Sequence, residues 1–332
     1  MAEGVKLEAL CRVQALPQLT SAIGLGAAVG SAAELQRRLT TNLAGEVADL
    51  AGEQLSAGVE LLRWLATRFA MENVKVILRG VMAGTRPETW QRHLLALPRE
   101  HALKPETVDA VKSVADIARL LPRGVLRQRF SEATAFYREE RRPFFFEAAL
   151  DRAYYAELLA RTEALRGEDQ ELVRPLVCQE IDTYLLRLVA RGRFGYGLEA
   201  KALLPMHVSG TGISRERFAA MLADADLRTA AGRALERALD ALPSAVAETG
   251  EAEEPTAPAD LEALAWNRLL RLANRAFRRS HMGLAAVVAF VAIRRLEVAN
   301  LITLSEGIRA QLLEGQVRAR LFPRRRMEVA HV

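Results

Sequence analysis

Acidic side chains that could take part in proton transfer recur in three similar phrases of the sequence, at residues 71–80, 179–188 and 296–304. Each phrase holds one Glu with an Asn or Asp within three residues of it, among apolar residues at helical spacing. The Glu positions 72, 180 and 297 are 108 and 117 residues apart. A carboxylate works as a general acid or base only in a cleft that shifts its pKa. Single carboxylates so far apart favour contacts between helices or with a partner over catalysis.

The remaining residues give little indication of a metal site or a nucleotide-binding site. Cys11 and Cys178 are far apart in the sequence, and the five His residues are scattered without the spacing of metal ligands. Residues 24–30 resemble a glycine-rich phosphate loop, but no strand pattern precedes them and no GxxxxGK motif occurs. Glu147 and Asp151 place two carboxylates on one helical face, which is common on solvated helices. The sequence therefore predicts no metal, no cofactor and no enzymatic activity.

Helical periodicity runs along the whole chain, and no stretch shows the alternation of a β-strand. The longest predicted helices contain the three phrases and cover residues 54–80, 169–191 and 284–313. We therefore expect an all-α fold. Repeats of this length are whole small domains rather than solenoid units. They predict three similar helical bundles, with bounds at residues 1–105, 106–222 and 223–332.

The composition is that of an ordinary globular protein, with 50% hydrophobic and 26% charged residues in a chain of 332. The formal net charge of +5 permits an acidic partner or an anionic membrane surface, but it does not indicate nucleic-acid binding. The longest apolar run, residues 282–293, has 12 residues, whereas a membrane span needs about 20. The N-terminus lacks the basic and apolar regions of a secretory signal. We expect a cytoplasmic protein.

Several stretches resemble, in order, the C subunit of the V/A-type ATPases of archaea and bacteria, whose eukaryotic counterpart is the d subunit of the vacuolar ATPase. Residues 146–159 (FEAALDRAYYAELL) look like the opening of the second half of that family, and residues 72–79 (ENVKVILR) are similar to its first-repeat motif. Residues 180–187 lie where the second copy is expected, and residues 282–308 resemble the closing helix. The resemblance covers most of residues 50–325. Residues 13–45, rich in Ala and Gly, match the family poorly.

The resemblance implies a funnel of three helical bundles that is peripheral to the membrane on its cytoplasmic face. Such a protein sits on the membrane rotor ring, receives the central stalk in its cavity and transmits torque without bond chemistry. It implies no nucleic-acid partner. The polar residues of the phrases then have two possible roles, contact with the stalk or attachment of one helix to another. The candidate partner-binding residues are Lys75, Arg79, Arg187, Arg191, Arg295, Glu297 and Asn300.

Two other classes of protein stay open at this stage. One is an all-α scaffold that binds an acidic protein or RNA and has no part in an ATPase. Co-purification with ring and stalk subunits would distinguish it from the first interpretation. The other is an all-α enzyme with an internal pocket, which would require clustered carboxylates such as a paired Asp-rich motif, and the sequence contains none.

Overall fold

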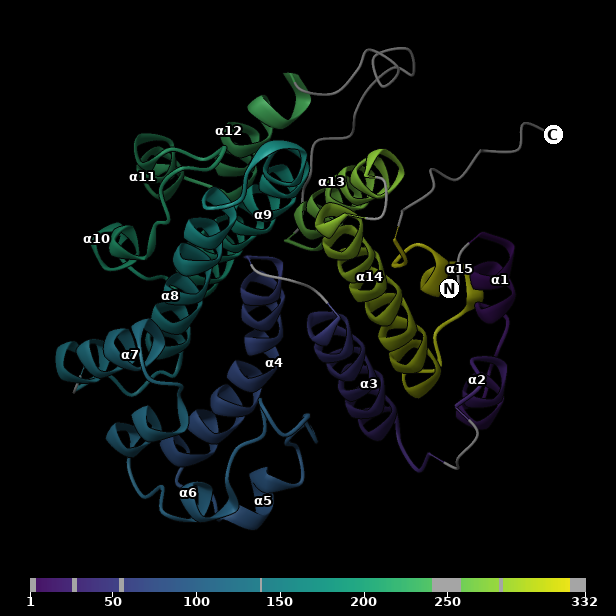
Figure 1. Cartoon of the computed structure of the whole chain (residues 1–332), viewed down its shortest axis with the longest axis horizontal. Helices are drawn as coiled ribbons and strands as arrows, with labels where there is room; N and C mark the ends of the chain where they lie inside the picture. The colour runs from purple at the N-terminus through teal and green to yellow at the C-terminus, as the bar shows by residue number, and fades with distance from the viewer. Residues whose placement is uncertain are drawn as a thin grey trace.

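A computed structural model describes residues 4–25, 29–53, 57–137, 139–240, 258–280 and 283–322. Within these residues the chain is built of helices and their connections, without a β-strand (Figure 1). The expected all-α fold is confirmed. Residues 26–28 of the glycine-rich stretch lie outside the described residues. The division at residues 105 and 222 and the funnel arrangement stay predictions.

Six long helices form the framework of the molecule (Figure 1). They are α3 (Ala32–Gly52), α4 (Ala57–Met82), α8 (Phe144–Glu163), α9 (Gly167–Arg187), α13 (Pro258–Arg279) and α14 (Leu284–Arg309). The three repeated phrases lie in α4, α9 and α14, close to the predicted spans. Helix α9 does not end at Arg187 but continues as a π-helical segment, η2 (Leu188–Gly195).

Shorter helices and turns connect this framework and cover its ends. In chain order they are α1 (Gly4–Leu10), α2 (Leu16–Ala22), α5 (Pro87–Gln91), α6 (Pro105–Asp109), η1 (Val114–Leu120), α7 (Val125–Phe136), α10 (Ala200–Leu203), η3 (Leu204–Met206), α11 (Arg215–Ala223), α12 (Leu227–Asp240) and α15 (Glu314–Arg318).

The first and third phrases are anchored by asparagines that make the same two hydrogen bonds. Asn73 Nδ2 donates to the carbonyl of Leu95 (2.9 Å), and the Leu95 N–H donates to Asn73 Oδ1 (2.7 Å). Asn300 makes the same pair with Phe322, at 2.6 and 2.8 Å. In both cases the bonded backbone lies 22 residues further along the chain. The side chain of each long helix thus fixes the segment that returns along it.

The helix ends that follow these asparagines also correspond. Gly84 and Gln311, each 11 residues after its Asn, adopt positive φ angles of 64° and 52°. The next N–H, of Thr85 or Leu312, donates to the carbonyl five residues before it (3.0 and 2.9 Å), which is the Schellman pattern of a helix end. A five-residue helix, α5 or α15, follows at the same offset. The two parts of the chain therefore share one local structure.

The second phrase uses an aspartate in the corresponding position. The Ile213 N–H donates to Asp182 Oδ1 (3.1 Å), 31 residues further along the chain. The connection is longer because η2 adds a π-helical turn and α10 and η3 follow it. The three phrases thus correspond through Asn73, Asp182 and Asn300 rather than through their Glu residues.

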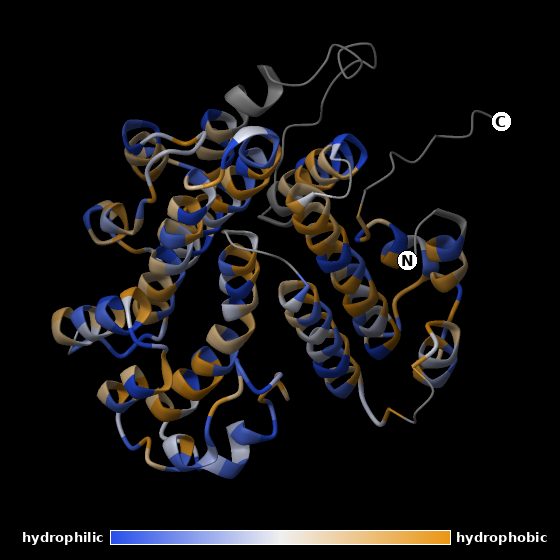
Figure 2. Cartoon of the chain, viewed as in Figure 1, coloured by the Kyte–Doolittle hydropathy of each residue, from blue (hydrophilic) through white to orange (hydrophobic). Residues whose placement is uncertain are grey.

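Two hydrophobic clusters hold these helices together. Figure 2 shows hydrophobic residues along much of the ribbon of α14. The larger cluster extends from Ala51 to Ile293 and includes most of the buried apolar residues of α4, α8, α9 and α13. The smaller one joins α1–α3 to the second half of α14, through residues such as Leu35, Leu43, Val298 and Leu304. The two ends of the described chain therefore share a core.

Candidate partner-binding cavity

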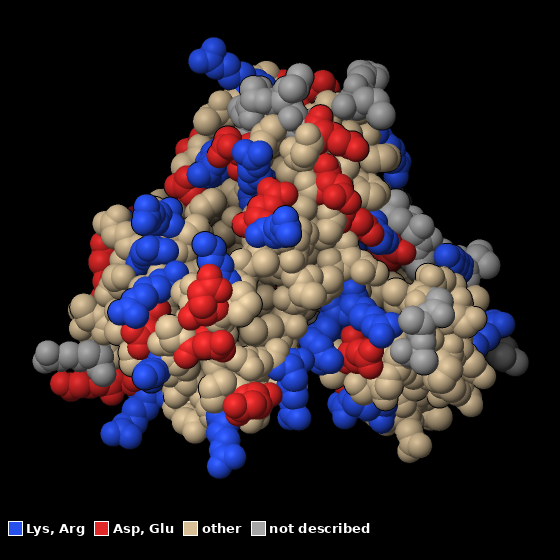
Figure 3. Space-filling model, turned by 60° about the horizontal axis from the view of Figure 1, so that its bottom comes forward, with Lys and Arg blue, Asp and Glu red and all other residues tan. Residues whose placement is uncertain are grey.

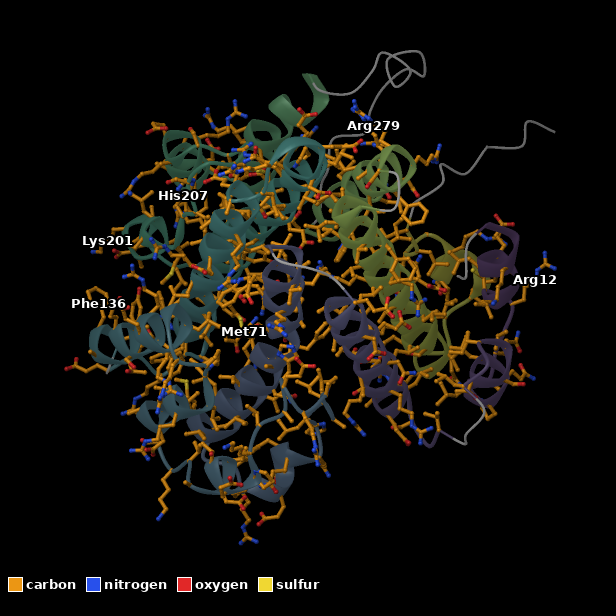
Figure 4. The ribbon with its side chains drawn as sticks, viewed as in Figure 1. Arg12, Met71, Phe136, Lys201, His207 and Arg279 are labelled. Carbon is orange, nitrogen blue, oxygen red and sulfur yellow. The ribbon has the colours of Figure 1, made fainter. Side chains whose placement is uncertain are left out.

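A cavity of about 200 Å³ opens between α4, α8, α9, η2, α13 and α14. Met71, which lines it, lies near the centre of the view in Figure 4. Six basic and four acidic side chains line the cavity: Arg68, Lys75, Arg79, Arg187, Arg191, Arg295, Glu72, Glu147, Asp151 and Glu180. Five of the seven predicted site residues are therefore brought together here, from three helices and η2.

One wall of the cavity is a ladder of ion pairs between α4 and α8. Lys75 Nζ lies 2.7 Å from Asp151 Oδ1 and 3.1 Å from Glu72 Oε1. Arg79 donates to both oxygens of Glu147, at 2.6 and 2.9 Å. Burial of Lys75 opposes its charge, but the carboxylates of Asp151 and Glu72 outweigh that effect and raise its pKa. Lys75 and Arg79 are thus satisfied within the chain.

A second set of ion pairs ties the three long helices to one another. Glu180 of α9 accepts from Arg68 of α4 (3.2 Å) and from Arg295 of α14 (2.6 Å). Only 9% of the Glu180 side chain is exposed. Burial alone would raise the pKa of Glu180, but Arg295 and Arg68 outweigh it and lower the pKa. Arg68 and Arg295 each precede the anchoring Asn by five residues, so the repeat also places this pair of arginines.

Tyr154 and Tyr155 of α8 complete the wall, and Trp64 supports Tyr154 from outside the cavity lining. Trp64 stacks on Tyr154, with ring centroids 5.9 Å apart, and donates to the Tyr154 carbonyl (3.0 Å). Burial raises the pKa of Tyr154 and of Tyr184, so both phenols stay neutral. Because Lys75 and Glu180 are also held in their charged forms, none of these four groups titrates near neutral pH. Burial also raises the pKa of Asp151, although Lys75 acts in the opposite direction. The six basic and four acidic side chains of the cavity suit the recognition of a charged partner.

Arg187 and Arg191 differ from the other basic residues of the cavity. Both are exposed, and neither side chain has a hydrogen bond or ion pair with any residue that the structure describes. They lie at the end of α9 and in η2, where the helix widens. With four carboxylates against six basic groups, the excess positive charge of the cavity therefore lies at these two arginines.

Glu297 and Asn300 do not line the cavity. Both are buried, with 8% and 4% exposed. Glu297 pairs with Arg294, whose guanidinium also binds Glu46 of α3 at 2.7 and 2.8 Å. Asn300 holds the backbone at Phe322. The contacts of these two residues attach α14 to neighbouring segments.

Sequence reasoning left Arg68 out of the candidate set and treated Glu147 and Asp151 as solvated carboxylates. A signal for the last two was present. Lys75 and Arg79 are four residues apart, as are Glu147 and Asp151. Two antiparallel helices with such spacings can form two ion pairs in reverse order, as α4 and α8 do.

The comparisons with known proteins agree with this architecture. The family described as ATP synthase (C/AC39) subunit matches residues 25–320. The chain belongs to the ATP synthase (C/AC39) subunit family. The match includes α3 to α15 and thus all three anchored phrases and the whole cavity. It confirms the resemblance found in the sequence and reaches into the stretch of residues 13–45 expected to match poorly.

One relative within this family is the C subunit of the A-type ATP synthase of Methanocaldococcus jannaschii. It is 26% identical to the chain over 272 residues, which cover 79% of this chain and 65% of that protein. The matched part thus spans slightly less than two thirds of the length of that relative. Among the described residues, no helix combines the length and the hydrophobicity that a membrane-spanning segment needs.

Proposed function

We propose that the chain is the central-rotor adaptor of a V/A-type rotary ATPase, which joins the membrane rotor ring to the central stalk and transmits torque for ion-coupled ATP synthesis or hydrolysis. Membership of the ATP synthase (C/AC39) family over residues 25–320 carries this proposal. In this role the chain is a non-catalytic component, peripheral to the membrane on its cytoplasmic face. Its partners are the ring subunits and the stalk subunits.

The ion pairs of the cavity support a mechanical role. Glu180 links α4, α9 and α14 through two arginines, and the α4–α8 ladder adds Lys75 and Arg79. Close-packed interiors deform little under load. A torque applied to one of these helices is therefore passed to the others instead of bending a single element.

For the stalk contact, we propose that Arg187 and Arg191 bind an acidic surface of the stalk. Both are exposed and lack a partner within the described chain, so a partner's carboxylate need not displace an existing ion pair. Arg79, by contrast, is already bound by Glu147 in two hydrogen bonds. Charged groups at such an interface speed association and make it sensitive to salt.

The test is a pull-down of stalk and ring subunits from the native source by the tagged chain and by an Arg187→Glu, Arg191→Glu variant. The variant should retain its melting temperature and its ring subunits but lose stalk subunits, most clearly at low salt. Arg119→Glu, Arg129→Glu is the matched control, since both arginines are exposed and lie outside the cavity. Unchanged stalk capture by the cavity variant would refute the stalk site. Failure of the wild-type chain to capture either set would favour a binding scaffold instead.

A further inference from the structure

The side of α13 turned away from the core carries five arginines. They are Arg268, Arg271, Arg275, Arg278 and Arg279, and the last four are exposed. Spacings of three and four residues place them along one side of the helix. From the first to the last the stripe is about 17 Å long, at about 1.5 Å per residue. The opposite side of α13 is buried through Ala265, Leu269, Ala273 and Ala276.

These arginines are not neutralised in the usual way. On several other helices an exposed arginine pairs with a carboxylate one turn away, as Arg129 does with Glu132 and Arg309 with Glu306. Figure 3 shows acidic and basic side chains interspersed over another face of the molecule. No ion pair joins the α13 arginines to a carboxylate in the part of the chain that the structure describes. Arg268 lies close enough to Asp182 to lower the pKa of that carboxyl.

The geometry of the arginine stripe indicates which class of molecule it could bind. Its arginines form a straight row on a rigid helix packed against α9 and α14. The exposed Phe277 of α13 lies about 100° or more around the helix from each arginine, so the row itself contains no aromatic side chain. Stacking on aromatic residues is the usual means of binding unpaired bases, and aromatic anchors are common at protein interfaces. A guanidinium donates to a phosphate through two parallel N–H groups. A row of such groups matches a surface that presents many phosphates at no fixed spacing, as a lipid bilayer does.

We propose that the arginine stripe of α13 docks onto an anionic phospholipid surface. This contact goes beyond the proposed rotor role and is independent of the cavity, since none of the five arginines lines it. Lipid headgroups diffuse laterally, so the contact does not fix the chain to one point of the membrane. Arg279 lies near the upper edge of the molecule in Figure 4, at the end of α13.

The experiment is co-sedimentation of the full chain with vesicles of phosphatidylcholine mixed with phosphatidylserine, and with vesicles of phosphatidylcholine alone. The chain should bind the anionic vesicles and not the neutral ones. Binding should weaken as salt shortens the screening length below about 8 Å. The Arg271→Gln, Arg275→Gln, Arg278→Gln variant should bind about a hundredfold more weakly, because each basic residue near an anionic membrane contributes about fivefold.

Two further variants separate charge from structure. Arg271→Lys, Arg275→Lys, Arg278→Lys keeps the charges and should keep most of the binding. Arg129→Gln, Arg309→Gln removes exposed arginines from other helices and should bind as the wild type does. Equal binding to both kinds of vesicle, or unchanged binding by the triple Gln variant, would overturn the proposal. The proposal would also be overturned if the chain did not bind vesicles but bound a polyglutamate peptide or single-stranded RNA through the same three arginines.

Discussion

Asn73 and Asn300 hold equivalent positions in two parts of the chain 227 residues apart, and each closes a ring of two hydrogen bonds with backbone 22 residues further on. An amide side chain can do this because it carries a donor and an acceptor. Asp182, at the corresponding place in α9, accepts from the Ile213 N–H. The choice between Asn and Asp therefore follows the hydrogen bonds that the returning segment requires.

Asn73→Asp and Asn300→Asp should each destabilise the chain by about 1–3 kcal/mol, because a buried carbonyl loses its donor and faces a carboxylate. Asp182→Asn, which keeps an acceptor for Ile213, is the matched control and should cost less. Urea unfolding monitored by circular dichroism measures all three. If the control proves as destabilising as the Asn→Asp variants, the donor is not what these positions require.

Gln311→Gly should stabilise the chain, by about 0.5–1 kcal/mol, because Gln311 adopts a left-handed conformation that costs little for glycine. Gly84 occupies the equivalent helix end with φ of 64°, and a Cβ there would meet no atom within 4 Å. Gly84→Gln should therefore destabilise by a similar amount through backbone conformation alone. Melting temperatures of the two variants should move in opposite directions, and a shift in the same direction would contradict the equivalence of the two ends.

The positions of the long helices could be predicted from apolar spacing, as the start of α14 at Leu284 illustrates. The repeat was also visible, but through Glu72, Glu180 and Glu297, whose roles differ. Glu72 pairs with a neighbour on its own helix, whereas Glu180 binds two other helices. The two arginines that bind Glu180 lie 112 and 115 residues away from it in the sequence. Such pairs are determined by how the helices pack in the folded chain. The backbone groups that Asn73 and Asn300 bind could not be predicted either, because nearly every residue type carries the same backbone groups.

The same limit applies to Arg79 and Arg187, which follow Glu72 and Glu180 by seven residues. Both line the cavity, but their surroundings differ, because α8 brings Glu147 to Arg79. The π-helical turn of η2 was likewise not predicted. No residue type in this stretch marks a π-helical turn, and the turn lengthens the connection between Asp182 and Ile213.

Glu180→Gln should destabilise the chain at neutral pH by about 3 kcal/mol, because it leaves two partly buried arginines without their carboxylate. The pKa of Glu180 is lowered in the folded state from its ordinary value of 4.5. Its ion pairs therefore stabilise the fold fully above pH 4.5, and this contribution is lost as the pH falls through the lowered pKa. The difference in unfolding free energy between wild type and variant should shrink below pH 4.5. A difference that stays constant down to pH 3 would show that Glu180 acts through packing rather than charge.

A charge swap separates the internal role of Arg79 from a role in stalk binding. Arg79→Glu should lower stability by about 1 kcal/mol, since the pair with Glu147 is partly exposed. Adding Glu147→Arg should recover most of that loss, because the opposite charges face each other again. If Arg79 serves only α4–α8 attachment, the swapped chain captures as much stalk as the wild type, measured by pull-down beside the melting temperature. If the melting temperature recovers but stalk capture does not, the stalk contacts the charge at position 79 directly. Arg79 would then join Arg187 and Arg191 in the proposed binding surface.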